Sequence, residues 1–113
     1  MLLDVVCVGA VDVDKKQASF TTIGDQVDVC QVGVNVIGAN YTGGYIALSG
    51  TSMATPLTSG CVACLISDYF DKIGTYPIER KVYEALKIHT KDLGIKGVDK
   101  VFGAGFVSLQ PLD

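Results

Sequence analysis

The sequence is short of long apolar runs, of excess charge and of histidine. None of its apolar runs approaches the roughly 18 residues that a membrane-spanning helix needs, and no signal peptide is visible. The formal net charge is −3, and no basic stripe offsets the acidic residues. We therefore expect neither a membrane nor a nucleic acid as partner.

Proline is also scarce, with 3 residues, whereas glycine is frequent, with 13. Hydrophobic residues make up 49% of the chain and charged residues 19%, a balance that indicates a packed core rather than disorder. The 113 residues suit one domain over positions 1–113, and no internal repeat or linker interrupts it. The composition favours an α/β protein with many tight turns.

The four cysteines lie inside apolar segments, where a free thiol behaves as a small hydrophobe: Cys7, Cys30, Cys61 and Cys64. Cys61-x-x-Cys64 has the spacing of a redox pair, but such a pair belongs at a helix N-terminus, and this one lies well inside a helical run. Cys7 and Cys30 have no close ligand neighbours that would make a zinc site. We expect reduced structural thiols and, from them, a cytoplasmic location.

Two patterns of apolar residues predict the secondary structure. Short β-branched runs predict strands near Val5–Val11, Val27–Cys30, Asn35–Gly38 and Tyr45–Leu48, with a last short strand in "FGAGFVSL". An apolar stripe at helical spacing predicts an amphipathic helix from about Ile78 to Thr90.

A helix of a different kind is expected from Ser52 to about Asp71. It carries no charge before Asp68, which predicts that protein surrounds it on every side. Thr51 or Ser52 would cap it, and Gly60, costly inside a helix, indicates a close packing contact.

Ser52 stands where a Gly-rich turn meets this helix, in "LSGTSMATP". A hydroxyl there lies at the positive end of the helix dipole, beside backbone N–H groups that have no partner inside the helix. Such N–H groups can stabilise an oxyanion that forms next to the serine. The pattern of residues alone fits a helix cap as well as a nucleophile.

The stretch "GTSMATP" resembles the nucleophile motif Gly-Thr-Ser-Met-Ala-x-Pro of the subtilisin-like serine proteases. The stretches "VVCVGAVD", "ASFTTIGDQVDV", "GVNVIGA" and "FGAGFVSL" resemble segments around that motif, so the resemblance covers nearly the whole chain. It looks nearest to the intracellular subtilisins. The chain departs from the family pattern at Gln31-Val32-Gly33, usually Ala-Pro-Gly, and at Leu57-Thr58-Ser59-Gly60, commonly His-Val-Ala-Gly.

The resemblance implies a fold and a set of roles. The fold would be the C-terminal part of the family's three-layer α/β domain, with short strands, a buried helix beginning at the serine and a second, amphipathic helix. Ser52 would be the nucleophile of a serine endopeptidase that acts on peptides or proteins. Thr51 and Met53 would support the nucleophile and the oxyanion, and Leu48 and Gly50 would line the substrate cleft.

The resemblance also implies that parts of the site are missing. In this family the catalytic order is Asp, His, Ser, and the Asp, His and oxyanion Asn segments precede the strand with which this chain begins. The single histidine, His89, follows the serine and cannot match the catalytic one. Because a serine without a base is a poor nucleophile, we expect an inactive fragment that needs the missing N-terminal portion. No cofactor would be required, although the family often binds calcium, and Asp25 and Asp28 resemble a peripheral cation site.

Two other interpretations stay open. "GTSMA" nearly fits the Gly-x-Ser-x-Gly elbow of α/β-hydrolases, with Asp68 or Asp71 and then His89 as partners. That elbow needs glycine at Ala54, and its fold is much longer than this chain. Alternatively, the chain is a non-catalytic interaction module or a truncated remnant of a protease, which would self-associate through exposed apolar surface.

Overall fold

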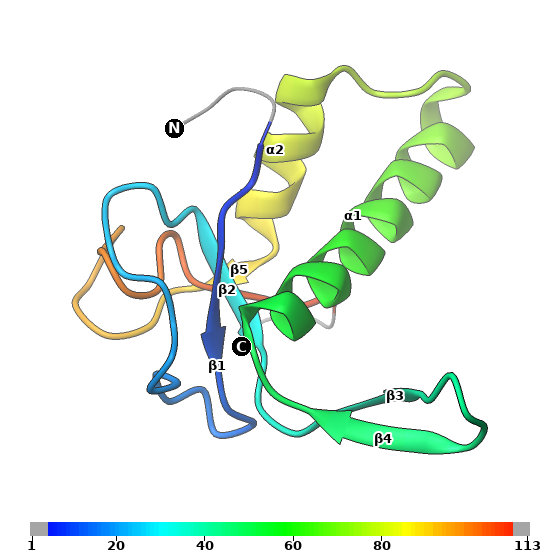
Figure 1. Cartoon of the computed structure of the whole chain (residues 1–113). Coiled ribbons are helices and arrows are strands. Elements are labelled where there is room, and N and C mark those ends of the chain that lie inside the picture. The colour runs from blue at the N-terminus through cyan, green and yellow to red at the C-terminus, as the bar shows by residue number, and fades with distance from the viewer. Residues whose placement is uncertain (1–4, 110–113) are drawn as a thin grey trace.

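The computed structural model describes residues 5–109, within which the chain forms six strands and two helices (Figure 1). In chain order these are β1 (Val8–Val11), β2 (Val29–Val32), β3 (Val36–Ala39), β4 (Tyr45–Leu48), α1 (Thr51–Ile73), α2 (Glu79–Ile88), β5 (Thr90–Lys91) and β6 (Phe106–Val107). The mixed α/β class and the main elements agree with the sequence prediction. The two-residue strand β5 was not predicted.

The main sheet has the strand order β1-β2-β6-β5. β1, β2 and β6 are parallel, with Val8 opposite Val29 and Cys30 opposite Phe106, and β5 runs antiparallel to β6. All four residues of β1 are buried, as expected for a continuous apolar run in a parallel sheet. The largest fully buried side chains are Leu86, Val11, Val29, Val107 and Cys30. The main core cluster joins sheet residues such as Val8, Val29 and Val107 to Ala54 of α1 and Leu86 of α2, so it lies between this sheet and the helices.

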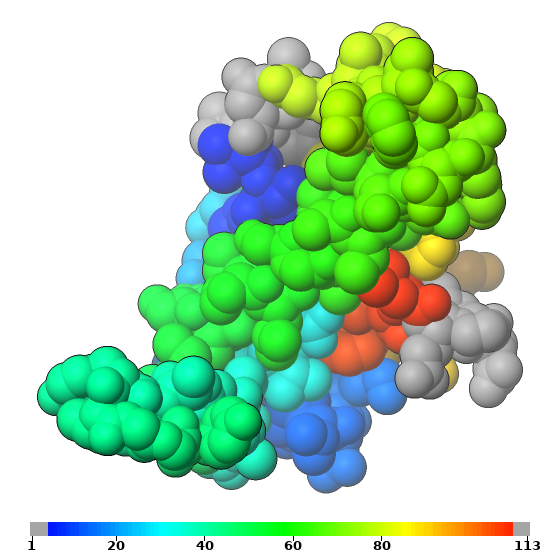
Figure 2. Space-filling model, turned by 90° about the vertical axis from the view of Figure 1, so that its right-hand side faces the viewer, coloured from blue at the N-terminus to red at the C-terminus, as the bar shows by residue number. Residues whose placement is uncertain are grey.

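Helix α1 packs against β1 and β2 and also contacts α2. Ala54 and Thr58 are its buried residues, while Cys61, Val62 and Leu65 border the core. The opposite side of α1 crosses the front of the molecule in Figure 2 without another segment over it. The prediction that protein surrounds this helix on every side is therefore wrong for the described residues, which cover it on one side only.

The uncovered side of α1 is small and uncharged over its first four turns. Its exposed residues before the first charged one, Asp68, are Ser52, Thr55, Pro56, Leu57, Ser59, Gly60, Ala63, Cys64 and Ser67. A Cβ built on Gly60 would meet no atom within 4 Å, so the close contact predicted at this glycine is not made. Helix surfaces that face water normally carry charged residues, so the composition of this side is that of an interface.

β3 and β4 form a separate antiparallel hairpin that projects from the molecule (Figure 1). Val36 pairs with Leu48 and Ala39 with Tyr45, and most of its residues are exposed. A lone two-stranded hairpin is only marginally stable in water. Two hydrogen bonds hold its base, from Asn35 N–H to Ser49 Oγ (2.9 Å) and from Gly50 N–H to the carbonyl of Gly33 (2.7 Å).

Helix α2 is amphipathic, as predicted, with Leu86 as its buried residue. It begins at Glu79 and ends at Ile88, because Thr90 leaves the helix to pair with Val107. No helix within residues 5–109 is long and apolar enough to cross a membrane.

Candidate active site

Ser52 is the second residue of α1 and is exposed to solvent. Its helix starts beside the carboxyl end of β2, because Gly50 is hydrogen-bonded to Gly33, the residue that follows β2. Ligands of open α/β sheets bind outside the carboxyl ends of the strands. The fold therefore presents the Ser52 hydroxyl at the edge of the sheet where binding sites form.

The turn before Ser52 depends on Gly50. This residue has φ 153° and ψ 162°, a backbone conformation that residues with a side chain rarely adopt. Its carbonyl accepts the N–H groups of Met53 (3.0 Å) and Ala54 (3.3 Å) and so starts the helix. Helix α1 thus has Gly50 as its N-cap and no side-chain cap. The prediction that Thr51 or Ser52 caps the helix is wrong, because both residues already lie within it.

Two backbone donors remain free at this helix start. The N–H groups of Thr51 and Ser52 donate to no acceptor among the described residues, since the residues four positions earlier, Ala47 and Leu48, lie in β4 and not in the helix. The positive end of the α1 dipole adds to their pull on negative charge. An oxyanion formed beside Ser52 Oγ would therefore meet unoccupied donors.

The other predicted site residues lie around the same turn. Thr51 and Met53 are half-buried, and the Met53 N–H is already bound to the Gly50 carbonyl. Leu48 ends β4 with 47% of its surface exposed, four residues before Ser52. A Cβ built on Gly50 would meet only the Ser52 nitrogen, at 3.7 Å, so the approach over this residue is open. The predicted cleft residues, Leu48 and Gly50, therefore lie close to Ser52, because β4 and the turn lead directly into α1.

The Ser52 hydroxyl makes no hydrogen bond to a base among the described residues. The His89 ring interacts through Nδ1 with the Ala85 carbonyl of its own helix, at 2.9 Å. Asp68 pairs with Lys72 at 3.0 Å and lies sixteen residues after Ser52, about 24 Å along a helix with a rise of 1.5 Å per residue. The structure therefore does not assemble the Ser, Asp, His set that the α/β-hydrolase interpretation requires.

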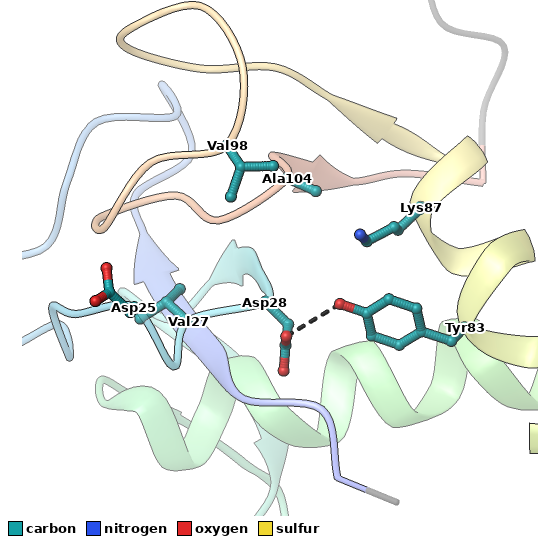
Figure 3. A pocket seen from close by; sticks show the side chains of 7 residues that line it. All are labelled: Asp25, Val27, Asp28, Tyr83, Lys87, Val98 and Ala104. Atoms are coloured by element: carbon teal, nitrogen blue, oxygen red, sulfur yellow. Dashed lines mark hydrogen bonds between the residues drawn. The ribbon is translucent and has the colours of Figure 1, made fainter. Parts of the chain in front are cut away.

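The predicted cation ligands line a pocket of about 310 Å³ on another part of the molecule (Figure 3). Asp28 is 9% exposed, and both of its carboxylate oxygens are engaged. Oδ2 accepts the Cys7 N–H at 2.8 Å, and Oδ1 accepts the Tyr83 hydroxyl at 3.0 Å. Asp25 is exposed, and Lys87 brings a positive charge to the same pocket.

This arrangement does not fit a calcium ion. Calcium takes about 6–8 oxygen ligands, and no group of three or more His, Cys, Asp or Glu residues within residues 5–109 could hold a metal. Asp28 instead joins α2 to the start of β2. Burial, followed by the hydrogen bond to Asp28 and its charge, raises the pKa of Tyr83 to about 12, so the hydroxyl stays a donor.

The four thiols are free in the structure. Burial, with a smaller effect of Asp99, raises the pKa of Cys30 to about 12. Burial and the neighbouring Cys64 also raise the pKa of Cys61. Both shifts lower the thiolate fraction near neutral pH, which is the opposite of what a reactive redox cysteine needs.

Comparison with known proteins shows the family of the chain that carries this turn. The model of the Subtilase family, Peptidase S8, matches residues 2–105. The chain belongs to the subtilase family. Over 65 residues it is 42% identical to Subtilisin DY of Bacillus licheniformis. The matched stretch covers 58% of this chain and 24% of that protein. Over 66 residues it is 47% identical to a thermostable alkaline protease of Halalkalibacterium halodurans, covering 58% of this subtilase chain and 18% of the relative.

Solved structures agree with this assignment. A lanthipeptide protease superposes with a TM-score of 0.82 at 23% identity over 91% of this chain, a likeness of fold. The prenylagaramide maturation protease PagA has a TM-score of 0.78 at 34% identity over 93% of this chain. In each case the subtilase chain spans 40% of the solved one.

Proposed function

We propose that this chain supplies the nucleophile, Ser52, to a serine endopeptidase site that a second segment completes. The observation that supports this most is the start of α1, where an exposed hydroxyl lies beside two unoccupied N–H donors. Membership of the subtilase family supports the assignment of that hydroxyl as the nucleophile. The substrate in this proposal is a peptide or a protein.

The second segment, here called the complementing segment, would carry the catalytic aspartate and histidine and the oxyanion asparagine. Two facts support the proposal that such a segment is needed. The chain spans about a quarter or less of its curated relatives and 40% of the solved ones, and the Ser52 hydroxyl makes no hydrogen bond to a base among the described residues. We place the docking surface on the uncovered, uncharged side of α1, because burial of that side would remove apolar surface from water.

The chemistry would then proceed at Ser52 Oγ. The oxygen adds to the scissile carbonyl carbon while its proton passes to the histidine of the complementing segment. Negative charge collects on the carbonyl oxygen beside the N–H of Ser52. The amine leaves with the transferred proton, and water then hydrolyses the acyl group and restores the serine hydroxyl.

Hydrolysis of a fluorogenic peptide tests this proposal. The chain alone should be inactive, and the mixture with the complementing segment should cleave the peptide. Ser52→Ala should abolish cleavage by the mixture, whereas Ser19→Ala, at an exposed serine in the loop between β1 and β2, should not. Cleavage by the mixture that survives Ser52→Ala would contradict the assignment.

The alternative function is a non-catalytic module that associates through α1. The uncharged side of α1 and exposed residues beyond it, such as Phe70 (38%) and Ile73 (61%), favour it. Sedimentation of the chain alone distinguishes the two: a concentration-dependent dimer whose formation Gly60→Arg prevents supports association through this face. The four free thiols, with Cys64 exposed, support a cytoplasmic location for either function.

A further inference from the structure

Gly33 joins the sheet to the turn that carries Ser52. It follows the last residue of β2, and its N–H donates to the Val11 carbonyl at 2.9 Å. Its own carbonyl accepts the Gly50 N–H at 2.7 Å. Through this one buried residue, the ends of β1 and β2 are connected to the residue that starts α1.

The space around Gly33 admits no side chain. A Cβ at this position would lie 2.7 Å from the Gly50 carbonyl oxygen, 2.8 Å from the Ala10 Cβ and 3.3 Å from the Ala54 Cβ. Its φ lies outside the left-handed region, so its conformation does not itself demand glycine. Only the close approach of Gly50 and the two alanines does.

The closest of these contacts is with an atom that organises the nucleophile turn. The Gly50 carbonyl accepts the N–H groups of Met53 and Ala54, and Ser52 lies inside the turn that these hydrogen bonds close. A side chain at position 33 would crowd this oxygen, because its Cβ would lie 2.7 Å away. The shift would pass into the first turn of α1 while the rest of the helix stayed on the sheet.

We propose that Gly33 is a positioning residue for Ser52, which acts by letting the Gly50 carbonyl seat against β2. The proposal rests on the proposed nucleophilic role of Ser52. A misplacement of about 1 Å at an active site can lower the rate roughly 10²-fold. Gly33→Ala should therefore slow the reaction of Ser52 by at least about tenfold.

The first measurement is hydrogen exchange of the chain, which needs no activity. In Gly33→Ala, the amides of Gly50 and Ala54 should exchange at least about tenfold faster relative to the amide of Leu65 in the same helix. Gly38→Ala is the matched control, because a Cβ there meets no atom within 4 Å and its φ is also unstrained. Unchanged protection of Gly50 in Gly33→Ala would overturn the proposal.

The second measurement is the rate at which a fluorophosphonate labels Ser52 in the mixture with the complementing segment. Gly33→Ala should lose at least about tenfold in this rate. Val107→Ala, which weakens the core far along the chain, should lose none under conditions where the protein stays folded. An equal loss in Val107→Ala would mean that general destabilisation, not positioning, is measured.

A double variant identifies the contact that carries the effect. Ala10→Gly removes the Ala10 Cβ from the crowded site but leaves the Gly50 oxygen in place. Added to Gly33→Ala, it should restore part of the thermal stability without restoring the labelling rate. Full recovery of labelling would overturn the role of the Gly50 carbonyl. If the unaltered mixture is not labelled at all, the proposed function fails, and the exchange experiment still decides on Gly33.

Discussion

Gly60→Ala separates the two states in which α1 can exist. In the chain alone, Gly60 is exposed in mid-helix and a Cβ there meets no atom within 4 Å. Alanine is favoured over glycine inside a helix by about 1 kcal/mol, and no clash opposes the gain. A change of this size moves the melting temperature of a domain of about this length by roughly 4 °C. Thermal unfolding followed by circular dichroism should therefore show an increase.

The same methyl group should have the opposite effect on assembly. It stands on the side of α1 that we propose as the docking surface, where a closely packed segment would have no room for it. The concentration of complementing segment that gives half-maximal labelling should therefore rise by about tenfold, the equivalent of about 1.4 kcal/mol. Ser67→Ala is the control, because it raises helix propensity on the same side without adding bulk.

Two results would refute this reasoning. A lower melting temperature for Gly60→Ala in the chain alone would mean that something already packs on Gly60. Unchanged assembly in Gly60→Ala would mean that the complementing segment does not dock on this side of α1.

Tyr83→Phe should lower the free energy of unfolding near neutral pH by about 1 kcal/mol, because Asp28 loses a hydrogen-bond donor. The pKa of Tyr83 is raised from 10.0 to about 12, so its stabilisation is complete below pH 10 and is lost between pH 10 and about 12. Urea unfolding across that range should show a decline in stability that is smaller in Tyr83→Phe. The remaining decline arises from the cysteines whose pKa values are also raised, Cys7, Cys30 and Cys61. Identical declines in the two proteins would contradict the Tyr83 assignment. Thiol titration of the unfolded, unreduced protein should count four thiols; a count of two or fewer would refute the absence of a disulfide.

The sequence predicted those features that depend on nearby residues. β4 was predicted with its observed bounds, and the start of α1 to within one residue, because glycines and a long uncharged run mark them. The family motif predicts Ser52 as the nucleophile for the same reason, since the turn, the serine and the helix start are contiguous. The cap was wrong because a glycine backbone conformation, which residue types alone do not specify, begins the helix.

Features that depend on distant residues were missed. β5 exists only through its pairing with β6, sixteen residues later. Asp28 and Tyr83 are fifty-five residues apart, so no local pattern reveals that the tyrosine hydroxyl donates a hydrogen bond to this candidate cation ligand. Gly33 matches the glycine of the family's Ala-Pro-Gly, and only Gln31 and Val32 depart from that pattern. Its contact with Gly50 depends on the hairpin returning to the sheet, which no local pattern reveals. The uncharged run in α1 predicted that protein covers the helix on every side, whereas the described residues cover it on one side only.

The most direct test of the central claim is mass spectrometry of the fluorophosphonate adduct, with the labelled residue located by fragmentation. The chain alone should take up label no faster than background, and the complementing segment should raise the rate, with the adduct on Ser52. Rapid labelling of Ser52 in the chain alone, or an adduct on any other residue of the assembled site, would contradict the account.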